Sequence, residues 1–355
     1  MRIAWFGSSL VSAYWNGAAT YYRGIVRALH ERGHRVTFFE PDAFDRQAHR
    51  DIADPPWAEV VVYAPERWEE ALAQAAGFDV AVKASGVGVN DAELEAGVPR
   101  VGAGAAIYWD VDAPATLARL EFDPDDALSS RLPEFDLVLT YGGGDPVVER
   151  FRALGAHDCV PIYNALDPET HHPVDPDCRF ACDLAFVGNR LPDREARVEE
   201  FFFRPAELAP HRSFILGGSG WDDVALPANV AFLGHLSTND HNAFNSTPLA
   251  VLNVSRESMA ANGWSPATRL FEAAGAAACV ITDSWAGIEF FLEPGREVLV
   301  ADGGETVAEL LEGLSPRVAA EIGQGARRRI LREHTYAHRA AQLEEVMVAR
   351  ELVAS

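Results

Sequence analysis

The stretch GWSPATRLFEAAGAAACVIT, from Gly263 to Thr282, shows in short form the pattern that organises the whole chain. A polar loop comes first, a helix rich in alanine follows, and the apolar run CVIT predicts a strand. Ser265 is a natural N-cap and Pro266 suits the first helical position, so we expect the helix to begin there. Loop, helix and buried strand in this order are typical of a parallel sheet covered by helices, so the predicted fold class is α/β.

The same alternation runs on both sides of this stretch. A helix is predicted from Ala18 to Arg32, with Gly33 as its end, and the residues from about Arg317 to Leu352 are expected to be helical throughout. Short apolar runs predict strands at 3–6, 36–40, 60–63, 80–83, 137–140, 160–163, 184–187, 213–216, 230–233, 249–253, 279–282 and 298–300. We predict two Rossmann-like, doubly wound parallel sheets that face a cleft, followed by C-terminal helices.

Length and composition divide the chain into two domains. A chain of 355 residues suits two domains of ordinary size. The segment NALDPETHHPVDPD, at 164–177, is rich in Pro, Asp and His and has no periodicity, which is typical of a linker. We therefore predict an N-terminal domain at 1–165, a linker at 166–180, a C-terminal domain at 181–332 and a C-terminal helix at 333–355.

The charge of the chain argues against several partners. Its formal net charge of −23 repels nucleic acid and anionic membrane surfaces, and no apolar stretch approaches the roughly 20 residues of a membrane helix. The N-terminus enters a strand at once, so we expect no signal peptide and a cytoplasmic protein with reduced thiols. We expect no metal site, because CxxC spacing and a nearby histidine cluster are missing around the cysteines, which are Cys159, Cys178, Cys182 and Cys279.

The first turns of the helix after Pro266 carry the strongest candidate site. The hydroxyls of Ser265 and Thr268, the cation of Arg269 and the free N–H groups of a helix start can hold a diphosphate. Glu272 follows Thr268 by one helical turn on about the same face, where its carboxylate can accept both hydroxyls of a ribose. A capped helix with a surface Glu–Arg pair explains the spacing equally well.

The loop FVGNRLPDR follows the first predicted strand of the second half. Gly188 and Asn189 make a tight turn there, and either Arg190 or Arg194 could reach a phosphate. Ligands of α/β sheets bind beyond the carboxyl ends of the strands, which is where this loop is expected.

Two more loops follow the next predicted strands. They are GGSGW at 217–221 and GHLS at 234–237, and they are placed to hold a nucleobase by backbone groups and by stacking. Their candidate residues are Gly218 and His235.

The loop after the first strand, GSSLVSAYWNG from Gly7 to Gly17, permits close approach of a ligand because of its glycines and serines. It lacks the GxGxxG pattern, so we do not expect a dinucleotide site, although Glu40 sits where such a site places its ribose acid. The alternative for Glu40 is a strand-end charge in water. The candidate residues of the loop are Ser8, Ser9, Asn16 and Gly17.

Further candidate catalytic residues lie at the end of the strand predicted at 80–83 and in the predicted loop YWDVDAPATL. Lys83, the only lysine of the chain, could pair with a phosphate or an acceptor carboxylate; the alternative is a surface lysine. In YWDVDAPATL, Asp110 or Asp112 beside Trp109 could serve as a general base. The alternative for Asp112 is the N-cap of a helix that starts near Pro114.

Three segments resemble the GT-B glycosyltransferases, and more narrowly the CgeB-like (spore maturation protein) group. They are GSSLVSAYWNGAATYYRGIVRALHERGH, FVGNRLPDR and TRLFEAAGAAACVITDSWAGIEFFLEPGREVLVA. The resemblance implies a nucleotide-sugar donor bound mainly by the C-terminal domain and an acceptor bound mainly by the N-terminal domain, where the loop 7–17 lies. It also implies a last helix that crosses back to the N-terminal domain, and a diphosphate neutralised by arginines and a helix N-terminus, without a bound metal or other cofactor.

Glu272 matches the second glutamate of the E-x7-E pattern of retaining GT-B families, the one expected at the donor ribose. The first glutamate would fall at Trp264, and this departure leaves both the retaining and the inverting course open. Inverting enzymes of this fold often place a base in the N-terminal domain, and Asp110 or Asp112 could serve as that base.

The resulting hypothesis is a metal-independent, hexosyltransferase-like glycosyltransferase. It would move a sugar from a UDP-, GDP- or TDP-sugar to the hydroxyl of a soluble acceptor such as a glycan, metabolite or protein, while Arg194, Arg269 and the helix start stabilise the leaving group. A non-catalytic nucleotide-sugar binding protein is one alternative, which the missing glutamate favours. A sugar-nucleotide epimerase or a phosphorylase is another, but epimerases typically need several acids and histidines around the sugar, and these loops are poor in histidine. The oligomeric state is left open.

Overall fold

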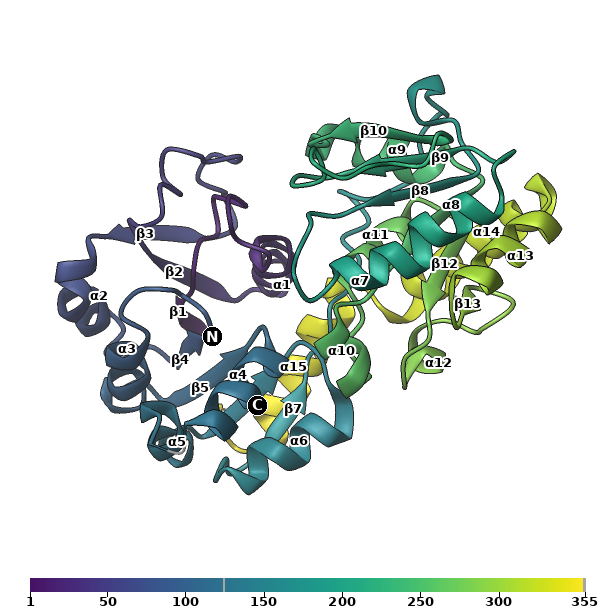
Figure 1. Ribbon diagram of the computed structural model, residues 1–355. Helices are drawn as coiled ribbons and strands as arrows, with labels where there is room; N and C mark the ends of the chain where they lie inside the picture. Colours follow the sequence, from purple (N-terminus) through teal and green to yellow (C-terminus); the bar gives the residue numbers. More distant parts are fainter. Residues whose placement is uncertain (124, 354–355) are drawn as a thin grey trace. The chain divides into compact units, whose positions relative to one another are not determined.

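The computed structural model of the protein, which describes residues 1–123 and 125–353, contains two compact units (Figure 1). Unit 1 comprises Met1–Asn164 together with Tyr336–Ser355, and unit 2 comprises Ala165–Thr335. Each unit is built on a parallel sheet, as the alternation of apolar strands and helices predicts. The segment 166–180, interpreted from the sequence as a linker, lies within unit 2.

The sheet of unit 1 has seven parallel strands in the order β3-β2-β1-β4-β5-β6-β7. The order reverses between β1 and β4, so the loops after these two strands lie at the switch point where α/β sheets bind ligands. The strands are β1 (Arg2–Phe6), β2 (Arg35–Pro41), β3 (Glu59–Tyr63), β4 (Val80–Ala84), β5 (Ala105–Asp110), β6 (Leu137–Thr140) and β7 (Cys159–Pro161). The helices are α1 (Ala19–Glu31), α2 (Trp68–Gln74), α3 (Asp91–Gly97), α4 (Ala113–Phe122), α5 (Ala127–Arg131), α6 (Gly144–Ala153) and α15 (Tyr336–Ala349).

The helix predicted near the N-terminus is confirmed as α1. Its apolar residues recur at helical spacing and are buried, and Gly33, with a φ of +88°, follows its end. Helix α15 packs against α1 at Gly24, where a Cβ atom would lie 2.2 Å from the ring of Tyr336. Only a glycine therefore allows this close approach between the two helices.

The sequence prediction is wrong at β5. Residues 105–110 form a central strand between β4 and β6, although we expected Trp109 and Asp110 to lie in a loop. The side chains of both residues are completely buried. The run AAIYWD was not recognised because a strand buried on both faces shows no alternation of polarity, and its terminal acid resembles the start of a loop.

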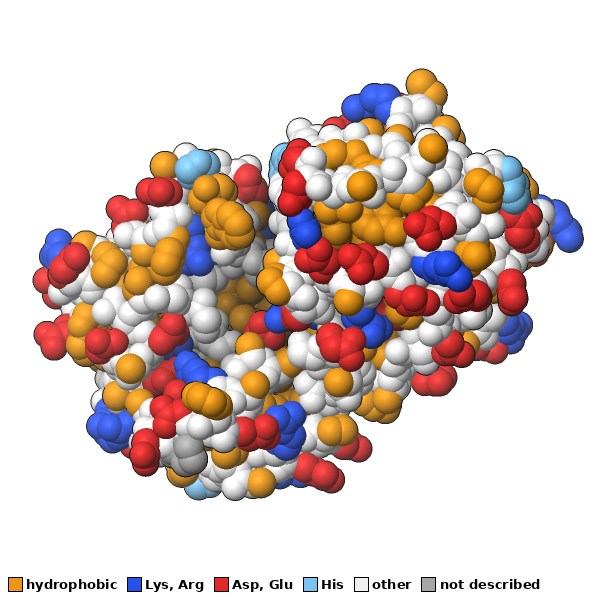
Figure 2. All heavy atoms as spheres, viewed as in Figure 1, with side chains coloured by type: hydrophobic (Ala, Val, Ile, Leu, Met, Phe, Trp, Pro, Cys, Tyr) orange, Lys and Arg blue, Asp and Glu red, His pale blue; other side chains and the backbone are white. Residues whose placement is uncertain are grey.

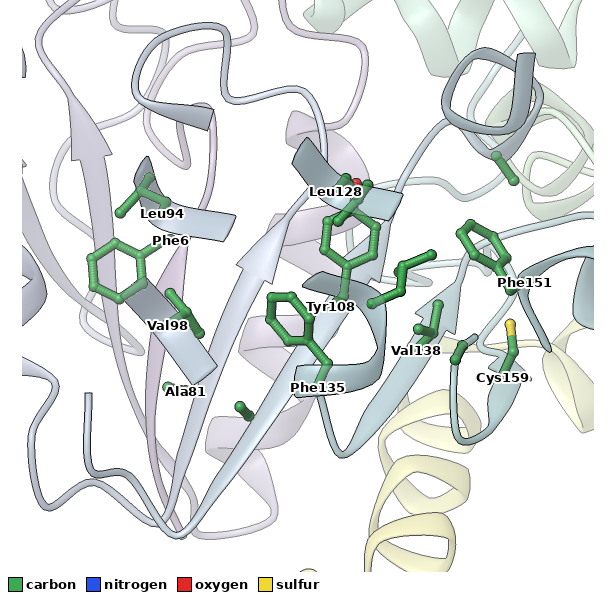
Figure 3. Close-up of a cluster of buried hydrophobic side chains, with 14 of the residues drawn as sticks. Phe6, Ala81, Leu94, Val98, Tyr108, Leu128, Phe135, Val138, Phe151 and Cys159 are labelled. Carbon is green, nitrogen blue, oxygen red and sulfur yellow. The ribbon is translucent and has the colours of Figure 1, made fainter. Parts of the chain in front are cut away.

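One hydrophobic core of unit 1 packs helices against a face of this sheet. Figure 3 shows Tyr108, from β5, among aromatic and aliphatic side chains from neighbouring strands and helices. Phe135 lies edge-on to Tyr108, with ring centroids 5.6 Å apart, and Phe6 of β1 stacks on Phe39 of β2 at 4.7 Å. Such packing holds the carboxyl ends of the strands, and hence their loops, in fixed positions.

The sheet of unit 2 has six parallel strands in the order β10-β9-β8-β11-β12-β13, with its switch point between β8 and β11. The strands are β8 (Leu184–Val187), β9 (Phe214–Gly217), β10 (Val230–Gly234), β11 (Ala250–Asn253), β12 (Val280–Asp283) and β13 (Leu299–Ala301). The helices are α7 (Glu195–Val198), α8 (Arg204–Leu208), α9 (His241–Ser246), α10 (Glu257–Asn262), α11 (Thr268–Gly275), α12 (Ile288–Phe291), α13 (Gly304–Gly313) and α14 (Pro316–Glu333), and a π-helical stretch (Glu199–Phe203) joins α7 to α8.

The prediction of one helical stretch from Arg317 to Leu352 is wrong at residues 334–335 and at 350–352, because α15 ends at Ala349. Helix α14 ends at Glu333 and α15 begins at Tyr336. Between them, the carbonyl of His334 accepts a hydrogen bond from the backbone N–H of Leu166 at 2.9 Å, and Thr335 forms a β-bridge with the same residue. The ring of His334 also packs against Phe290 and two further aromatic rings, so tertiary contacts override the local helical pattern.

Acidic side chains are spread over the visible surface of both units (Figure 2), in keeping with the net charge of −23. In the part of the chain that the structure describes, no helix combines the length and apolar character needed to cross a membrane.

Candidate functional site

The loop that leads into α11 has an unusual backbone. Gly263 and Trp264 both have a positive φ, at +66° and +49°, and the N–H of Trp264 donates to the carbonyl of Ala286 at 2.6 Å. The Trp264 ring covers Gly287, where a Cβ atom would lie 2.3 Å from it. A left-handed conformation is rare for a bulky residue, so surrounding contacts must hold it in place.

The predicted start of α11 is wrong by two residues. The helix begins at Thr268 with Ala267 at the N-cap position, and the hydroxyl of Ser265 donates to the carbonyl of Gly263 at 2.9 Å instead of capping the helix. The strained turn at 263–264 and the extended backbone of Ala267 delay the helix until after Pro266. Thr268 and Arg269 therefore occupy the very first turn.

Two arginines, Arg194 and Arg269, lie within electrostatic reach of one another near this first turn. Burial, together with the charges of Arg269 and Arg256, lowers the pKa of Arg194 to about 10. Burial also lowers the pKa of Arg269. Nε of Arg194 and Nη1 of Arg269 are buried without a hydrogen-bond partner, and neither guanidinium forms an ion pair within 4 Å among the described residues. Partly buried cations that lie near one another favour an anion between them, so this is a candidate anion site.

Glu272 lies one turn further along α11 and is only 8% exposed. Burial alone would raise the pKa of Glu272, but the charges of His171, Arg269 and His241 outweigh it and hold that pKa below its usual value. The ion-pair contact of its carboxylate is with His171, Oε1 to Nε2, at 3.6 Å. The alternative of a surface Glu–Arg pair is therefore wrong.

The sequence reasoning singled out His235 but missed His171 and His241. We described the loops as poor in histidine, but the structure brings His171 and His241 within electrostatic reach of Glu272, and the exposed His235 near His241. Burial lowers the pKa of His241. The doublet His171–His172 was visible in the sequence, but its place beside α11 depends on tertiary structure.

The loops after β8, β9 and β10 are tied together by backbone hydrogen bonds. Gly188 N donates to Gly217 O at 3.0 Å, and Gly218 N donates to Gly234 O at 2.7 Å. Gly218 has a φ of +117°, and a Cβ atom there would lie 2.2 Å from the carbonyl oxygen of Gly188. Arg194 packs on Gly188, with Nη1 3.0 Å from where a Cβ atom would be. The structure thus brings Gly188, Gly218 and Arg194 together.

Two side chains fix these loops further. The Asn189 side chain accepts a hydrogen bond from Ser219 N at 3.0 Å. The indole of Trp221 is buried and donates to the carbonyl of Gly188 at 2.8 Å, so it supports the loop and cannot stack on a nucleobase.

The loop after β1 in unit 1 is shaped by its own polar side chains. Ser8 donates to Asn16 at 2.9 Å, and the Asn16 amide donates to the carbonyl of Ser9 at 2.8 Å. Of the four candidate residues here, only Gly17 is exposed. The expectation that Glu40 lies in water is wrong, because its buried carboxylate accepts hydrogen bonds from Leu10 N at 2.6 Å and from the Ser9 hydroxyl at 3.1 Å.

Lys83 is neither a surface lysine nor an unpaired one. Its ammonium is completely buried and donates to Asp91 Oδ1 at 2.6 Å and to the carbonyl of Ala84 at 2.7 Å. The Asp91 carboxylate also accepts the backbone N–H groups of Val87 and Gly88. Lys83 therefore holds the loop after β4 in shape.

Asp110 and Asp112 meet at the carboxyl end of β5. Asp110 is fully buried and accepts hydrogen bonds from the Ser85 hydroxyl at 3.0 Å and from Asp112 N at 2.7 Å. Burial raises the pKa of Asp110 to about 6, against the effect of these hydrogen bonds. Asp112 occupies the N-cap position of α4, as predicted, but its side chain does not cap the helix.

Within the described residues, no group of three or more His, Cys, Asp or Glu side chains is arranged to hold a metal ion. All four cysteines are free thiols.

Comparison with solved structures identifies the fold. The HepE protein of Anabaena, solved with UDP and glucose, covers 98% of this chain and 100% of its own at 14% identity, with a TM-score of 0.67. Sucrose-phosphate synthase from Thermosynechococcus elongatus matches over 98% of both chains at 14% identity, with a TM-score of 0.69. An alpha-glucosyltransferase solved with UDP-glucose and DNA containing an abasic site matches over 98% of this chain and 99% of its own at 12% identity, with a TM-score of 0.73.

The chain has the GT-B fold. Residues 194–345 also match a family model described as glycosyl transferase-like, and this GT-B segment runs from Arg194 through α11 into α15. No curated protein matches the sequence. The GT-B fold predicted from the sequence is confirmed.

Proposed function

We propose that the protein is a glycosyltransferase that transfers a hexose from a nucleotide sugar, with UDP as the nucleotide. The observation that carries the proposal is the pair of partly buried guanidinium groups of Arg194 and Arg269 near the start of α11, which form no ion pair within 4 Å among the described residues, with the carboxylate of Glu272 one turn along the helix. The glycosyl transferase-like match over 194–345 supports the activity. Solved structures of the same fold that contain UDP or UDP-glucose support the choice of UDP.

We propose that successive turns of α11 bind different parts of the donor. Arg194, Arg269 and the N–H groups of the first helical turn would hold the diphosphate and stabilise the charge that develops as it leaves the anomeric carbon. Glu272 would accept the hydroxyls of the ribose. We propose that the two arginines supply this charge stabilisation without a bound metal, because they already bring two positive charges to one anion site.

The acceptor side is proposed for unit 1. The carboxyl-end loops of β1 and β4 lie at its switch point and the loop after β5 lies next to that of β4, and Asp110 or Asp112 would take the proton from the acceptor hydroxyl. Because the pKa of Asp110 is raised to about 6, this carboxyl is ionised and able to act as a base above that pH. We assign Lys83 a structural role instead of a catalytic one, since Asp91 neutralises it.

The net charge of −23 favours a soluble acceptor over nucleic acid, although one structure of this fold contains DNA. On the three segments that resemble it, we also propose that the chain belongs to the CgeB-like group. Unit 2 would then bind the donor and unit 1 the acceptor.

The first test is the affinity of the Glu272→Ala variant for UDP, measured by isothermal titration calorimetry. Loss of the hydrogen bonds between carboxylate and ribose should weaken binding by about 1–3 kcal/mol. Glu309→Ala, which changes an exposed glutamate on α13 of the same unit, is the matched control and should bind as the wild type does. Equal affinity of the Glu272 variant and the wild type would refute the ribose assignment.

A second candidate function is a nucleotide-sugar binding protein without catalysis. The specific observation in its favour is Trp264, which occupies the position of the missing glutamate and packs on Gly287 and Phe290. Incubation with a panel of nucleotide sugars separates the two functions. Release of a nucleoside diphosphate supports the transferase, whereas tight binding without turnover for any donor and acceptor supports the binding protein.

A further inference from the structure

A buried histidine from outside the sheet lies against the carboxylate of Glu272. His171 is 5% exposed, and its Nε2 atom is 3.6 Å from Oε1 of Glu272. It belongs to the aperiodic segment between the last strand of the first half and β8, which a sequence pattern alone does not connect with the site. We propose that His171 is a positioning residue of the donor site, which orients the Glu272 carboxylate toward the ribose hydroxyls; this deepens the proposed function and rests on it.

The backbone around His171 is clamped on both sides. The carbonyl of Thr170 accepts a hydrogen bond from the Asn242 amide at 2.9 Å, and the N–H of His172 donates to the same side chain at 3.3 Å. Across from it, Gly275 of α11 leaves room for the segment, because a Cβ atom there would lie 3.0 Å from the carbonyl oxygen of His171. Helices α9 and α11 thus hold the imidazole in place next to Glu272.

The orientation of the ring is consistent with a single donor to the carboxylate. Nδ1 of His171 is buried and has no hydrogen-bond partner among the described residues, whereas Nε2 faces Glu272. The Nε2–H group, which both the Nε2–H tautomer and the protonated ring carry, is therefore the N–H group next to Oε1. The distance of 3.6 Å is longer than a hydrogen bond, and contacts of this kind tighten when a ligand is bound.

The other cations near Glu272 have different tasks. Arg269 and His241 also act on the carboxylate electrostatically, but Arg269 lies on the first turn of α11, where the anion site is. A carboxylate that accepts hydrogen bonds from two hydroxyls must keep its plane in one orientation. A hydrogen-bond donor beside the carboxylate, away from the ribose, fixes that orientation. His171 is the group whose distance to Glu272 suits this task.

The test compares His171→Gln with His171→Asn in the full-length protein. The amide nitrogen of glutamine can reach the position of Nε2, whereas that of asparagine reaches only the position of Nδ1. We expect the asparagine variant to bind UDP about tenfold more weakly and the glutamine variant to retain most of the affinity. His172→Ala is the control, because the His172 side chain is exposed and should not affect binding.

A second probe shows whether the effect passes through the ribose. Calorimetry with 2′,3′-dideoxy-UDP, which lacks both hydroxyls, should give the same affinity for the wild type and the asparagine variant. If asparagine weakens both ligands equally, or if glutamine is no better than asparagine, the role of His171 as a positioning residue is overturned. If instead Glu272→Ala binds UDP like the wild type, it is the proposed ribose site that fails.

Discussion

Arg194 and Arg197 are three residues apart in the chain, but they differ in their ion pairing. The guanidinium of Arg197 is paired with the fully buried Asp283 at 2.6 Å and with Glu257 at 2.8 Å. Arg194 forms no such ion pair: burial and the positive charges of Arg269 and Arg256, only partly offset by Asp193 and Asp283, lower its pKa to about 10. A charge that is neutralised within the fold supports the fold, whereas an unneutralised one is kept at a cost in stability, as is common where a ligand binds.

This contrast predicts opposite effects of the same substitution. Arg194→Met should raise the free energy of unfolding of the ligand-free protein by about 1–3 kcal/mol, because an unfavourable buried charge is removed. The same variant should bind UDP at least tenfold more weakly, by loss of a charge-assisted contact to the diphosphate. Urea unfolding without ligand and calorimetry with UDP measure the two quantities.

The matched control is Arg197→Met. It leaves Asp283 buried without its counter-charge and should lower the free energy of unfolding by about 3–5 kcal/mol. An Arg194 variant that is less stable than the wild type without ligand would show that this side chain supports the fold rather than the site.

At the scale of the element, the loops after β9 and β10 each contain a glycine with a positive φ, and the space around the two glycines differs greatly. Gly218 and Gly234 both have a positive φ, at +117° and +70°. A Cβ atom on Gly218 would collide with the carbonyl of Gly188, whereas one on Gly234 would meet nothing within 4 Å. Only the first glycine is required by close contact as well as by backbone conformation.

We therefore expect Gly218→Ala to destabilise the protein more than Gly234→Ala does. Both variants carry the cost of a left-handed alanine, about 1–2 kcal/mol, and the collision should add at least about 1 kcal/mol at position 218. The Gly218 variant should also weaken UDP binding, because Gly188 and the Arg194 that rests on it must move. Thermal unfolding with and without UDP tests both points, and equal destabilisation by the two alanines would contradict them.

The elements that the sequence predicted correctly are those with a local signature. Strands such as β1 and β12 are short apolar runs, and α1 has a continuous amphipathic face with a glycine stop. The errors arose where distant contacts decide the outcome. The N-cap rule chose Ser265 because the positive φ of Trp264 has no local signature, and the helix prediction passed over His334, whose neighbours are aromatic rings from other helices.

In the candidate site, too, the residues with a local sequence pattern were predicted and those placed by distant contacts were not. Arg269 and Glu272 were recognisable from their spacing on one helix. The partners that change their chemistry were not, since His171 lies about a hundred residues before Glu272 in the sequence and 3.6 Å from it in the structure. Likewise, nothing near Lys83 in the sequence distinguishes a lysine that awaits a ligand from one that is neutralised by Asp91.

At the scale of the whole molecule, unit 1 is assembled from both ends of the chain. Helix α15 contributes buried Leu343 and Met347 to it, and Arg339 of the same helix donates to the carbonyl of Tyr163 at 3.2 Å. Truncation after Thr335 should therefore destabilise unit 1 strongly and unit 2 little. Hydrogen exchange followed by mass spectrometry distinguishes the units, with faster exchange expected in peptides of 1–164 and unchanged exchange in those of 180–330. Faster exchange in both units would mean that they unfold as one.

The hydrogen bond between Leu166 and His334 joins the two places where the chain leaves unit 1 and returns to it. On the ribosome, residues 1–164 of unit 1 emerge before unit 2, but α15 emerges only after unit 2. Folding of unit 2 brings the two ends of its own segment together at this bond, so that α15 arrives beside its docking partner without the entropy cost of closing a long disordered loop. We infer a fixed order of folding, in which unit 2 folds completely before unit 1 does.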